Sequence, residues 1–224
     1  MSFFKALAIS FLITSIACAQ DIEGGEPTIE APESDVFFSG IDISIDVSKL
    51  AFLATDFEDK YEASAGIFLF NRLGLTYEYG YGNLEPRQAI PNGTYQSEGT
   101  YYRVGMDVYF NIDPKNRIFL GGRFAESSFD DNGTFEITGQ LEDDFNGSFS
   151  RSGLEANWIE FIIGSEQEIY RNLFLGFKFR LRVLGSTDNF EPIEVYTIPG
   201  YGRTFDDTVP AMNFHLKYRF KPRS

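Results

Sequence analysis

Residues 173–185 read LFLGFKFRLRVLG and alternate strictly between two kinds of side chain. One set of alternate positions is wholly apolar and runs from Leu173 to Val183, whereas the other set contains Lys178, Arg180 and Arg182. This period of two predicts a β-strand that has an apolar face and a cationic face. The surroundings of such a strand must accept apolar side chains on one side and enclose three cations on the other.

The same alternation recurs in seven further segments, so the sequence predicts eight strands. These segments are FFSGIDISIDV (37–47), YEASAGIFLF (61–70), GLTYEYGYG (74–82), TYYRVGMDVYF (100–110), RIFLGGRFAES (117–127), ANWIEFIIGSE (156–166) and AMNFHLKYRF (211–220). Each has close to the roughly 9–11 residues that cross a bilayer at a tilt.

The connections between the predicted strands alternate in length. Short ones fall at 71–73, 111–116 and 171–172, and long ones at about 48–60, 83–98, 128–153 and 186–208. Short turns at one end and long loops at the other are typical of an outer-membrane barrel. The sequence therefore predicts an all-β fold, an eight-stranded antiparallel up-and-down transmembrane β-barrel over residues 36–220, with both termini on the periplasmic side.

Charge follows the same division between the two ends. The third and fourth long loops are acidic, with Asp130, Asp131, Glu136, Glu142, Asp143, Asp144, Asp188, Glu191, Glu194, Asp206 and Asp207. The side with the short connections instead carries Arg72, Lys115, Arg117 and Arg171. We expect the acidic residues to keep exposed extracellular loops solvated.

A soluble barrel or sandwich is the alternative, and it would turn its apolar face inward. Two features favour a lipid-facing band instead. The polar face is rich in glycine, as a narrow lumen requires, whereas a water-exposed sheet surface has no need of small residues. Aromatic residues also mark the ends of the apolar face, as in the interfacial girdles of membrane barrels (Tyr61, Tyr79, Tyr81, Tyr102, Phe110, Tyr218 and Phe220).

Residues 1–19 have the pattern of an export signal peptide, with a charged start, an apolar middle and a small-residue cleavage site at Ala17–Ala19. Residues 20–35 are acidic, contain two prolines and predict a disordered linker. Cys18 is the single cysteine, which excludes a disulfide framework. It could be a lipoprotein acceptor, although Ser15 stands where a lipobox prefers leucine.

An eight-stranded barrel is only wide enough to hold its own side chains, so charges that point inward should be paired. The parity of each strand predicts a structural charge network in the lumen. Its expected members are Glu78, Arg103, Asp107, Arg123, Glu160, Lys178, Arg180 and Arg182. The pairing depends on the shear of the barrel and stays open at this stage.

Five stretches carry a resemblance to known proteins: GIDIS (40–44), YEYGYG (77–82), EGTYYRVGMD (98–107), NWIEFIIG (157–164) and NLFLGFKFRLR (172–182). Through them the chain resembles the small eight-stranded outer-membrane β-barrel proteins common in Bacteroidota, and in particular an uncharacterised domain family of that group. The resemblance implies the barrel fold and an outer-membrane location over residues 36–220, and it implies no activity.

The residues that could carry chemistry are few. His215 is the only histidine and is predicted to face inward, so it is a candidate for a catalytic base or for a packed lumen residue. The stretch DDNGTFE (130–136) is only a partial calcium loop, and no metal site, cofactor site or phosphate loop is expected. A net charge of −14 argues against nucleic acid as a partner.

The sequence therefore predicts a non-enzymatic protein of the bacterial cell outer membrane, structural or interacting with the surroundings through acidic extracellular loops. The expected partners are the lipid bilayer with its lipopolysaccharide and the barrel-assembly machinery, together with weak divalent-cation, protein or glycan contacts at the loops. Two alternatives remain, a lumen-rim lipid-modifying or hydrolytic enzyme that uses His215 and a narrow porin-like channel.

Overall fold

The computed structural model describes residues 37–48, 58–86, 89–137, 145–187 and 194–222. The predicted signal peptide, the acidic linker and Cys18 lie outside these residues. No helix among the described residues is long and apolar enough to cross a membrane.

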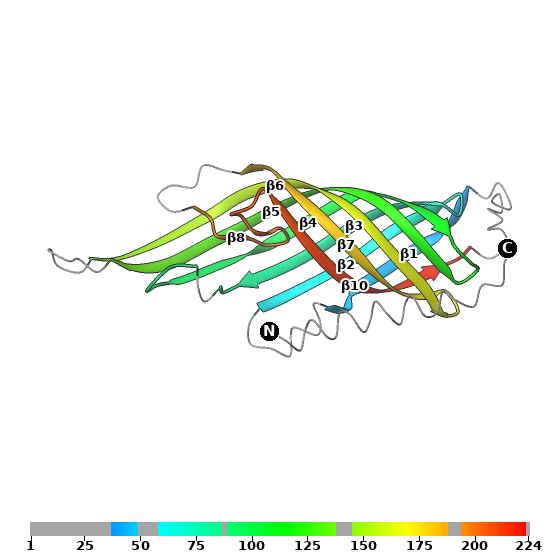
Figure 1. Cartoon of the computed structure of the whole chain (residues 1–224), viewed down its shortest axis with the longest axis horizontal. Coiled ribbons are helices and arrows are strands. Elements are labelled where there is room, and N and C mark those ends of the chain that lie inside the picture. The colour runs from blue at the N-terminus through cyan, green and yellow to red at the C-terminus, as the bar shows by residue number, and fades with distance from the viewer. Residues whose placement is uncertain (1–36, 49–57, 87–88, 138–144, 188–193, 223–224) are drawn as a thin grey trace, which may run out of the picture. The chain divides into compact units, whose positions relative to one another are not determined.

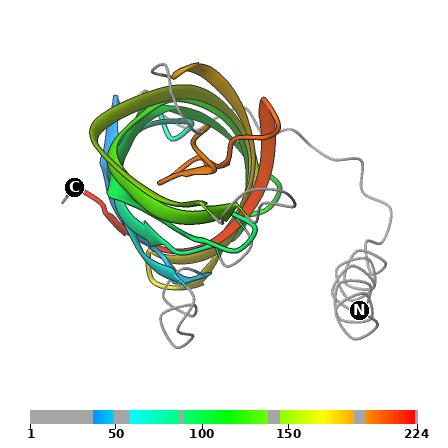
Figure 2. The ribbon, with the colours of Figure 1, turned by 90° about the vertical axis from the view of Figure 1, so that its left-hand side faces the viewer.

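Eight antiparallel strands form a closed barrel, as the sequence predicted (Figures 1 and 2). They are β1 (Phe38–Asp46), β2 (Glu58–Leu69), β3 (Leu73–Leu84), β4 (Thr94–Asn111), β5 (Asn116–Ile137), β6 (Phe145–Tyr170), β7 (Leu173–Thr187) and β10 (Thr208–Phe220). Sequence neighbours pair with one another, and β1 closes the ring on β10 from Ile41↔Phe220 to Asp46↔His215. Closure pairs strands that would otherwise be edges.

Strand β7 shows on which side of the wall each kind of side chain lies. Leu175 and Phe177 are 45% and 43% exposed on the outside, whereas Arg180 is 1% exposed in the interior. The other strands repeat this division, and their exposed apolar residues include Ile43, Ile67, Leu75, Val104, Leu120, Ile163 and Met212. We call this outer surface the apolar belt. It is the reverse of the arrangement in a soluble barrel.

Glycine on the inner face lets large side chains share the narrow lumen. A Cβ atom on Gly164 would lie 2.3 Å from the ring of Phe119 and 2.6 Å from the carbonyl oxygen of Phe177. Because Phe119 is fully buried, its ring has no free space into which it could move. At this position, the glycine that the sequence places on the inner face is therefore required for packing.

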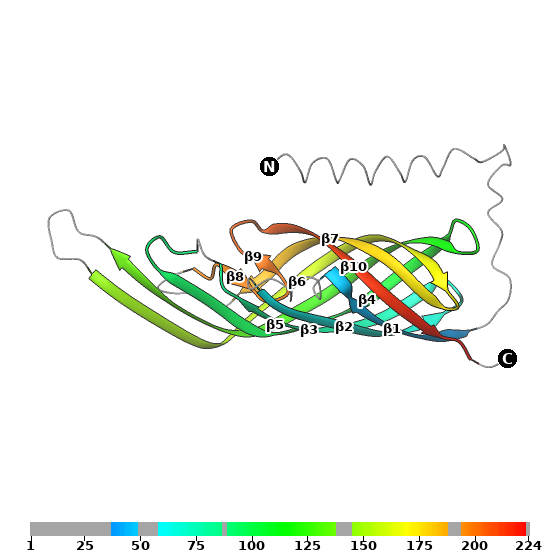
Figure 3. The ribbon, with the colours of Figure 1, turned by 90° about the horizontal axis from the view of Figure 1, so that it is seen from below.

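The predicted extent of the third long loop, 128–153, is wrong, because strands β5 and β6 continue well into it. They pair as far as Ile137↔Phe145, whereas β6 pairs with β7 only from Ala156↔Thr187 onward (Figure 3). Asp131 is consequently not a solvated loop acid. It is buried on β5, where its carboxylate accepts hydrogen bonds from Arg151 and from the Tyr95 hydroxyl.

The fourth long loop also departs from the prediction of a solvated segment. Its short strands β8 (Thr197–Ile198) and β9 (Gly202–Arg203) form a two-stranded hairpin, which Figure 2 shows within the ring of the barrel. Val195, Ile198 and Tyr201 are almost fully buried there, in a cluster with Trp158 and Tyr101. Burial of these apolar side chains draws the loop inward, and we call residues Thr197–Arg203 the plug.

Candidate functional site

The lumen contains two clusters of charged side chains. The first, which we call the central ion cluster, holds all eight residues predicted for the charge network, together with Glu62 on β2. The structure places the eight predicted residues at 8% exposure or less. Sequence parity places Glu62 on the inward face, but its position near the end of its predicted strand did not single it out.

Glu78 on β3 lies at the centre of this cluster. Its carboxylate oxygens lie 2.9 Å from Arg180 Nη1, 3.2 Å from Lys178 Nζ and 3.3 Å from Arg103 Nη1. Arg123 Nε is a more distant fourth neighbour at 3.8 Å. One buried carboxylate therefore faces cations from three other strands, which links β3 to β4, β5 and β7 across the lumen.

Glu160 on β6 is the second acidic centre. Its carboxylate is 2.7 Å from Arg103 Nε and 2.7 Å from Arg180 Nη1, and it accepts a 2.8 Å hydrogen bond from the indole N–H of Trp158. Arg182 Nε is further away, at 3.5 Å. Charge-assisted bonds of this number are what allow a guanidinium or a carboxylate to remain charged away from water.

The remaining acids of the central ion cluster make fewer contacts. Asp107 is bound at 2.6 Å by Arg123 Nη2. Glu62 is bound at 2.7 Å by Arg103 Nη1 and at 2.8 Å by the Tyr101 hydroxyl. The cluster is therefore paired across the lumen in the way that the cost of burying charge requires.

A second group, the short-turn ion cluster, lies toward the end where the short turns are. It comprises Asp42, Arg117, Glu166, His215, Lys217 and Arg219. Glu166 contacts Arg117, lies 2.6 Å from Lys217 Nζ and lies 3.3 Å from His215 Nε2. Arg117 lies at the short-turn end, as predicted, and its side chain is buried in the lumen, where it packs on the Phe174 ring at 4.1 Å.

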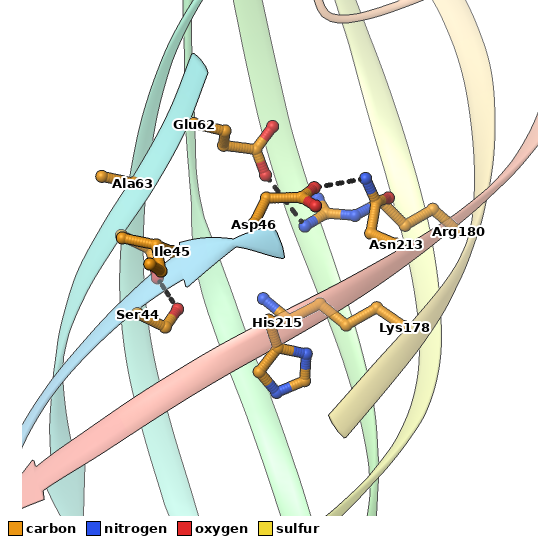
Figure 4. Close-up of a pocket in the computed structure, with 10 residues that line it drawn as sticks. Ser44, Ile45, Asp46, Glu62, Ala63, Lys178, Arg180, Asn213 and His215 are labelled. Carbon is orange, nitrogen blue, oxygen red and sulfur yellow. Dashed lines mark hydrogen bonds and ion pairs between the residues drawn. The ribbon is translucent and has the colours of Figure 1, made fainter. Parts of the chain in front are cut away.

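His215, a member of the short-turn ion cluster, is buried beside a small cavity that Lys178 and Arg180 of the central ion cluster also line (Figure 4). The cavity of about 10 Å³ is lined by Ser44, Ile45, Asp46, Glu62, Ala63, Ser64, Lys178, Arg180, Asn213 and His215. His215 Nδ1 and Asn213 Oδ1 have no hydrogen-bond partner within the described part of the chain. A cavity of this volume has room for about one water molecule.

This geometry supplies a carboxylate–imidazole pair without a nucleophile. Glu166 orients His215 through Nε2, but no hydroxyl of the described residues is hydrogen-bonded to the imidazole. Ser44 and Ser64 line the cavity and are bonded to each other, at 2.6 Å between their hydroxyl oxygens. Within the described residues, no group of three or more His, Cys, Asp or Glu side chains is arranged to hold a metal ion.

The plug lies between the central ion cluster and the long-loop end of the barrel. Arg103 Nη2 donates a 2.9 Å hydrogen bond to the carbonyl of Gly200, and Arg182 Nη1 donates a 2.6 Å bond to the carbonyl of Tyr201. The Tyr201 ring packs edge-on against Trp158, with 5.6 Å between ring centroids. The plug therefore closes the lumen above the central ion cluster.

Tyr95 braces the plug from strand β4. Its hydroxyl donates to Asp131 at 3.0 Å and accepts from the backbone N–H of Tyr196 at 3.3 Å. Burial, reinforced by the adjacent Asp131 carboxylate, raises the pKa of Tyr95 well above its ordinary value. Tyr95 thus stays protonated at neutral pH and keeps its bond to Asp131.

Taken together, these features define a class: a closed eight-stranded barrel with an apolar exterior and a lumen filled by paired charges and a plug. The chain belongs to the family described as a domain of unknown function (DUF6048), whose model matches residues 1–221. No curated protein matches the chain. Among solved structures it is similar to the crystal structure of Acinetobacter baumannii CarO2, at 12% identity and a TM-score of 0.44, over 84% of this chain and 100% of that one.

Proposed function

We propose that this protein lies in the outer membrane of a bacterial cell, in keeping with its resemblance to Bacteroidota barrels, and acts there without catalysis. In this proposal it is a structural or surface-interaction protein whose acidic outer end meets ions, glycans or another protein. Its partners within the membrane are lipid and lipopolysaccharide, and the barrel-assembly machinery inserts it. It requires no cofactor and does not bind nucleic acid.

The observation that carries the proposal is the apolar belt. Phe161, Ile163 and Leu120 are each more than half exposed on the outside of the barrel, and apolar neighbours surround them on adjacent strands. A contiguous apolar surface of this kind on a closed barrel is stable in lipid, where paired strands leave no unsatisfied backbone groups. Tyr61, Tyr79 and Phe110 are exposed at the predicted borders of the belt, where aromatic rings favour the interface.

The acidic end supports the choice of a surface role. Among the described residues, the exposed carboxylates at the long-loop end are Glu85, Glu98, Asp130, Glu136, Glu155, Glu194, Asp206 and Asp207. Arg203 is an exposed cation of the same end. An excess of one sign of charge steers partners of the opposite sign and keeps the end hydrated.

The filled lumen favours this role over that of a channel, because the plug and the central ion cluster occupy the path that a solute would take. The enzyme alternative meets a similar obstacle. His215 adjoins a cavity of about 10 Å³, which has no room for an acyl chain or a sugar. Loss of a lipid-modifying activity in His215→Ala would nevertheless revive that alternative.

Closure of the barrel can be tested by the gel mobility of the detergent-extracted protein. We expect the unheated protein to migrate as a compact band and the boiled protein to migrate more slowly. Identical mobility before and after boiling would contradict a closed membrane barrel.

Location and orientation can be tested by labelling intact cells with a membrane-impermeant maleimide. We expect labelling of Glu136→Cys, which is exposed on the β5–β6 hairpin, and no labelling of Asp113→Cys, its matched control in the turn between β4 and β5. Both variants should react after lysis. Labelling of Asp113→Cys alone in intact cells would show the opposite orientation. If neither variant is labelled in intact cells, the protein is not exposed at the cell surface.

The surface role itself can be tested by neutralising the acidic end. A variant with Glu85→Gln, Glu136→Gln, Asp206→Asn and Asp207→Asn should lose binding of a cationic probe, such as a lysine-rich peptide, while its folded gel mobility is retained. A variant with Arg72→Gln and Arg171→Gln at the other end is the control. Equal binding by all three proteins would refute an interaction through the acidic end.

A further inference from the structure

The plug presents two backbone carbonyl groups to two arginines. The oxygens of Gly200 and Tyr201, on consecutive residues, accept from Arg103 Nη2 at 2.9 Å and from Arg182 Nη1 at 2.6 Å. A guanidinium pair that converges on two neighbouring oxygens is the arrangement that proteins use to bind carboxylate and phosphate. Here neutral carbonyl oxygens take the places of the charged oxygens of a ligand.

The charge of the surrounding cluster is not balanced. Five cations, namely Arg103, Arg123, Lys178, Arg180 and Arg182, share the central ion cluster with four carboxylates, namely Glu62, Glu78, Asp107 and Glu160. Among the described residues, the cluster as defined therefore has one cation more than it has carboxylates, and Asp46 is a further buried carboxylate at the cavity that Lys178 and Arg180 line.

Arg182, the cation next to the plug, is further from its nearest carboxylate than the other four cations are from theirs. Its one carboxylate within ion-pair distance among the described residues is Glu160, at 3.5 Å from Nε, while Glu62 is a more distant negative charge, and Nε has no hydrogen-bond partner there. Arg182 is 8% exposed, so little water reaches it. A buried cation with an incomplete set of acceptors favours an anion over a neutral carbonyl.

We propose that Arg103 and Arg182 form an oxyanion-binding site in the outer lumen, which the plug occupies when no ligand is bound. The ligand is a small solute or exposed group that carries a carboxylate or a phosphate. Binding replaces the two carbonyl oxygens by two anionic oxygens, and the plug moves away from Trp158. This inference goes beyond the proposed surface role and does not depend on it.

The plug is suited to reversible displacement. Strands β8 and β9 are two residues each and share only two residue pairs, so the hairpin is held by its packing on Trp158 and Tyr101 and not by its own strand pairing. One residue of the plug tolerates no side chain, because Gly200 has a φ of +84° and a Cβ atom there would lie 2.5 Å from the Tyr101 ring. The exposed acidic side chains at the mouth oppose an approaching anion, but salt screens this repulsion beyond about 8 Å.

Trp158 provides the readout, because it is the only tryptophan in the chain and packs directly against Tyr201. The full-length protein in detergent micelles is titrated with inorganic phosphate and, separately, with acetate, at ionic strength held constant with sodium chloride. The same titrations are made with Gly200→Val, whose side chain prevents the plug from seating. Gly200→Val with Arg182→Gln is the matched control, and gel mobility verifies that each variant is folded.

We expect Gly200→Val alone to change the Trp158 emission and to bind one of the two anions at least tenfold more tightly than the natural sequence. Adding Arg182→Gln should return the affinity to that of the natural sequence. Preference for phosphate or for acetate identifies which oxyanion the site takes. Tyr201→Ala, which removes the ring against Trp158, is a second way to free the plug and should reproduce the gain.

Three results would overturn the proposal. The first is a displaced plug, seen in the emission, without tighter binding of either anion. The second is tighter binding that survives Arg182→Gln. The third is a Trp158 emission that stays unchanged in both Gly200→Val and Tyr201→Ala, because the plug would then not be displaceable.

Discussion

Replacement of Glu78 by glutamine tests the reasoning about the lumen most directly. The change keeps the size of the side chain and removes the negative charge that faces Arg103, Arg123, Lys178 and Arg180. Removing one partner of a buried ion pair typically costs about 3–5 kcal/mol, because the other partner is left buried and uncompensated. The structure decides where in this range the loss should fall.

Three of the four cations keep another carboxylate. Arg103 retains Glu160, Arg123 retains Asp107, and Arg180 retains Glu160. Lys178 has no other carboxylate partner among the described residues. The penalty is therefore concentrated on one ammonium group, and we expect the free energy of unfolding to fall by about 3 kcal/mol, the lower end of the range.

Reversible urea unfolding in phospholipid vesicles measures this loss. With a slope of about 1–3 kcal/mol per molar urea, the midpoint should move down by about 1–3 M. Adding Lys178→Met to Glu78→Gln removes the stranded ammonium and should recover at least half of the lost stability. Glu136→Gln, at an exposed position, is the control and should change stability by less than about 0.5 kcal/mol. A Glu78→Gln protein as stable as the natural sequence, or a double variant weaker than the single one, would refute the idea that this carboxylate balances the lumen.

Three further outcomes follow from the wall and the turns. Phe177→Arg places a cation in the middle of the apolar belt and should lower the unfolding free energy in the same vesicles by about 2–4 kcal/mol, whereas Phe177→Leu should change it little. Gly164→Val should lower the unfolding free energy by about 1–3 kcal/mol, because the new side chain is overpacked against Phe119. This loss would be seen as a lower temperature for the gel-mobility shift. Hydrogen bonds from Asn116 and Lys115 lower the pKa of Asp113 in the folded protein. The carboxylate therefore stabilises the fold at a pH above its unfolded-state pKa of about 3.9, and this effect is lost as the pH falls through the lowered folded-state pKa. The difference in unfolding free energy between the natural sequence and Asp113→Ala should shrink below about pH 4.

The barrel could be predicted from the sequence because the residues of each strand show which of its faces is apolar. Alternation between apolar and polar residues predicts which face of each strand points inward, and the strand around Trp158 keeps this alternation despite the register shift between Ala156 and Trp158. The same parity could have placed Arg117 inside, since it is two positions before the buried Phe119. The charge network predicted from the sequence did not include it.

What could not be predicted depends on contacts between distant segments. The partners of Glu78 lie on three other strands, and their identity follows from the register of the whole ring rather than from any local pattern. Strands β5 and β6 continue through Ser, Asn, Gly and Asp residues that resemble a loop, because pairing with each other holds them extended. The plug left a weak signal in the sequence, the apolar Ile198 and Tyr201 with the nearby Val195 in an otherwise acidic loop, but the charge of that loop favoured a solvated segment.

The length of β6 has a consequence for what meets this protein first. Its eleven residues from Phe145 to Glu155 continue past the last pair with β7, which is about 36 Å measured along the strand. In the proposed setting even a steeply tilted hairpin of this reach rises clear of the phosphate layer and into the sugar coat. Antibodies, phages and neighbouring cells would then contact the β5–β6 hairpin before they reached the lipid.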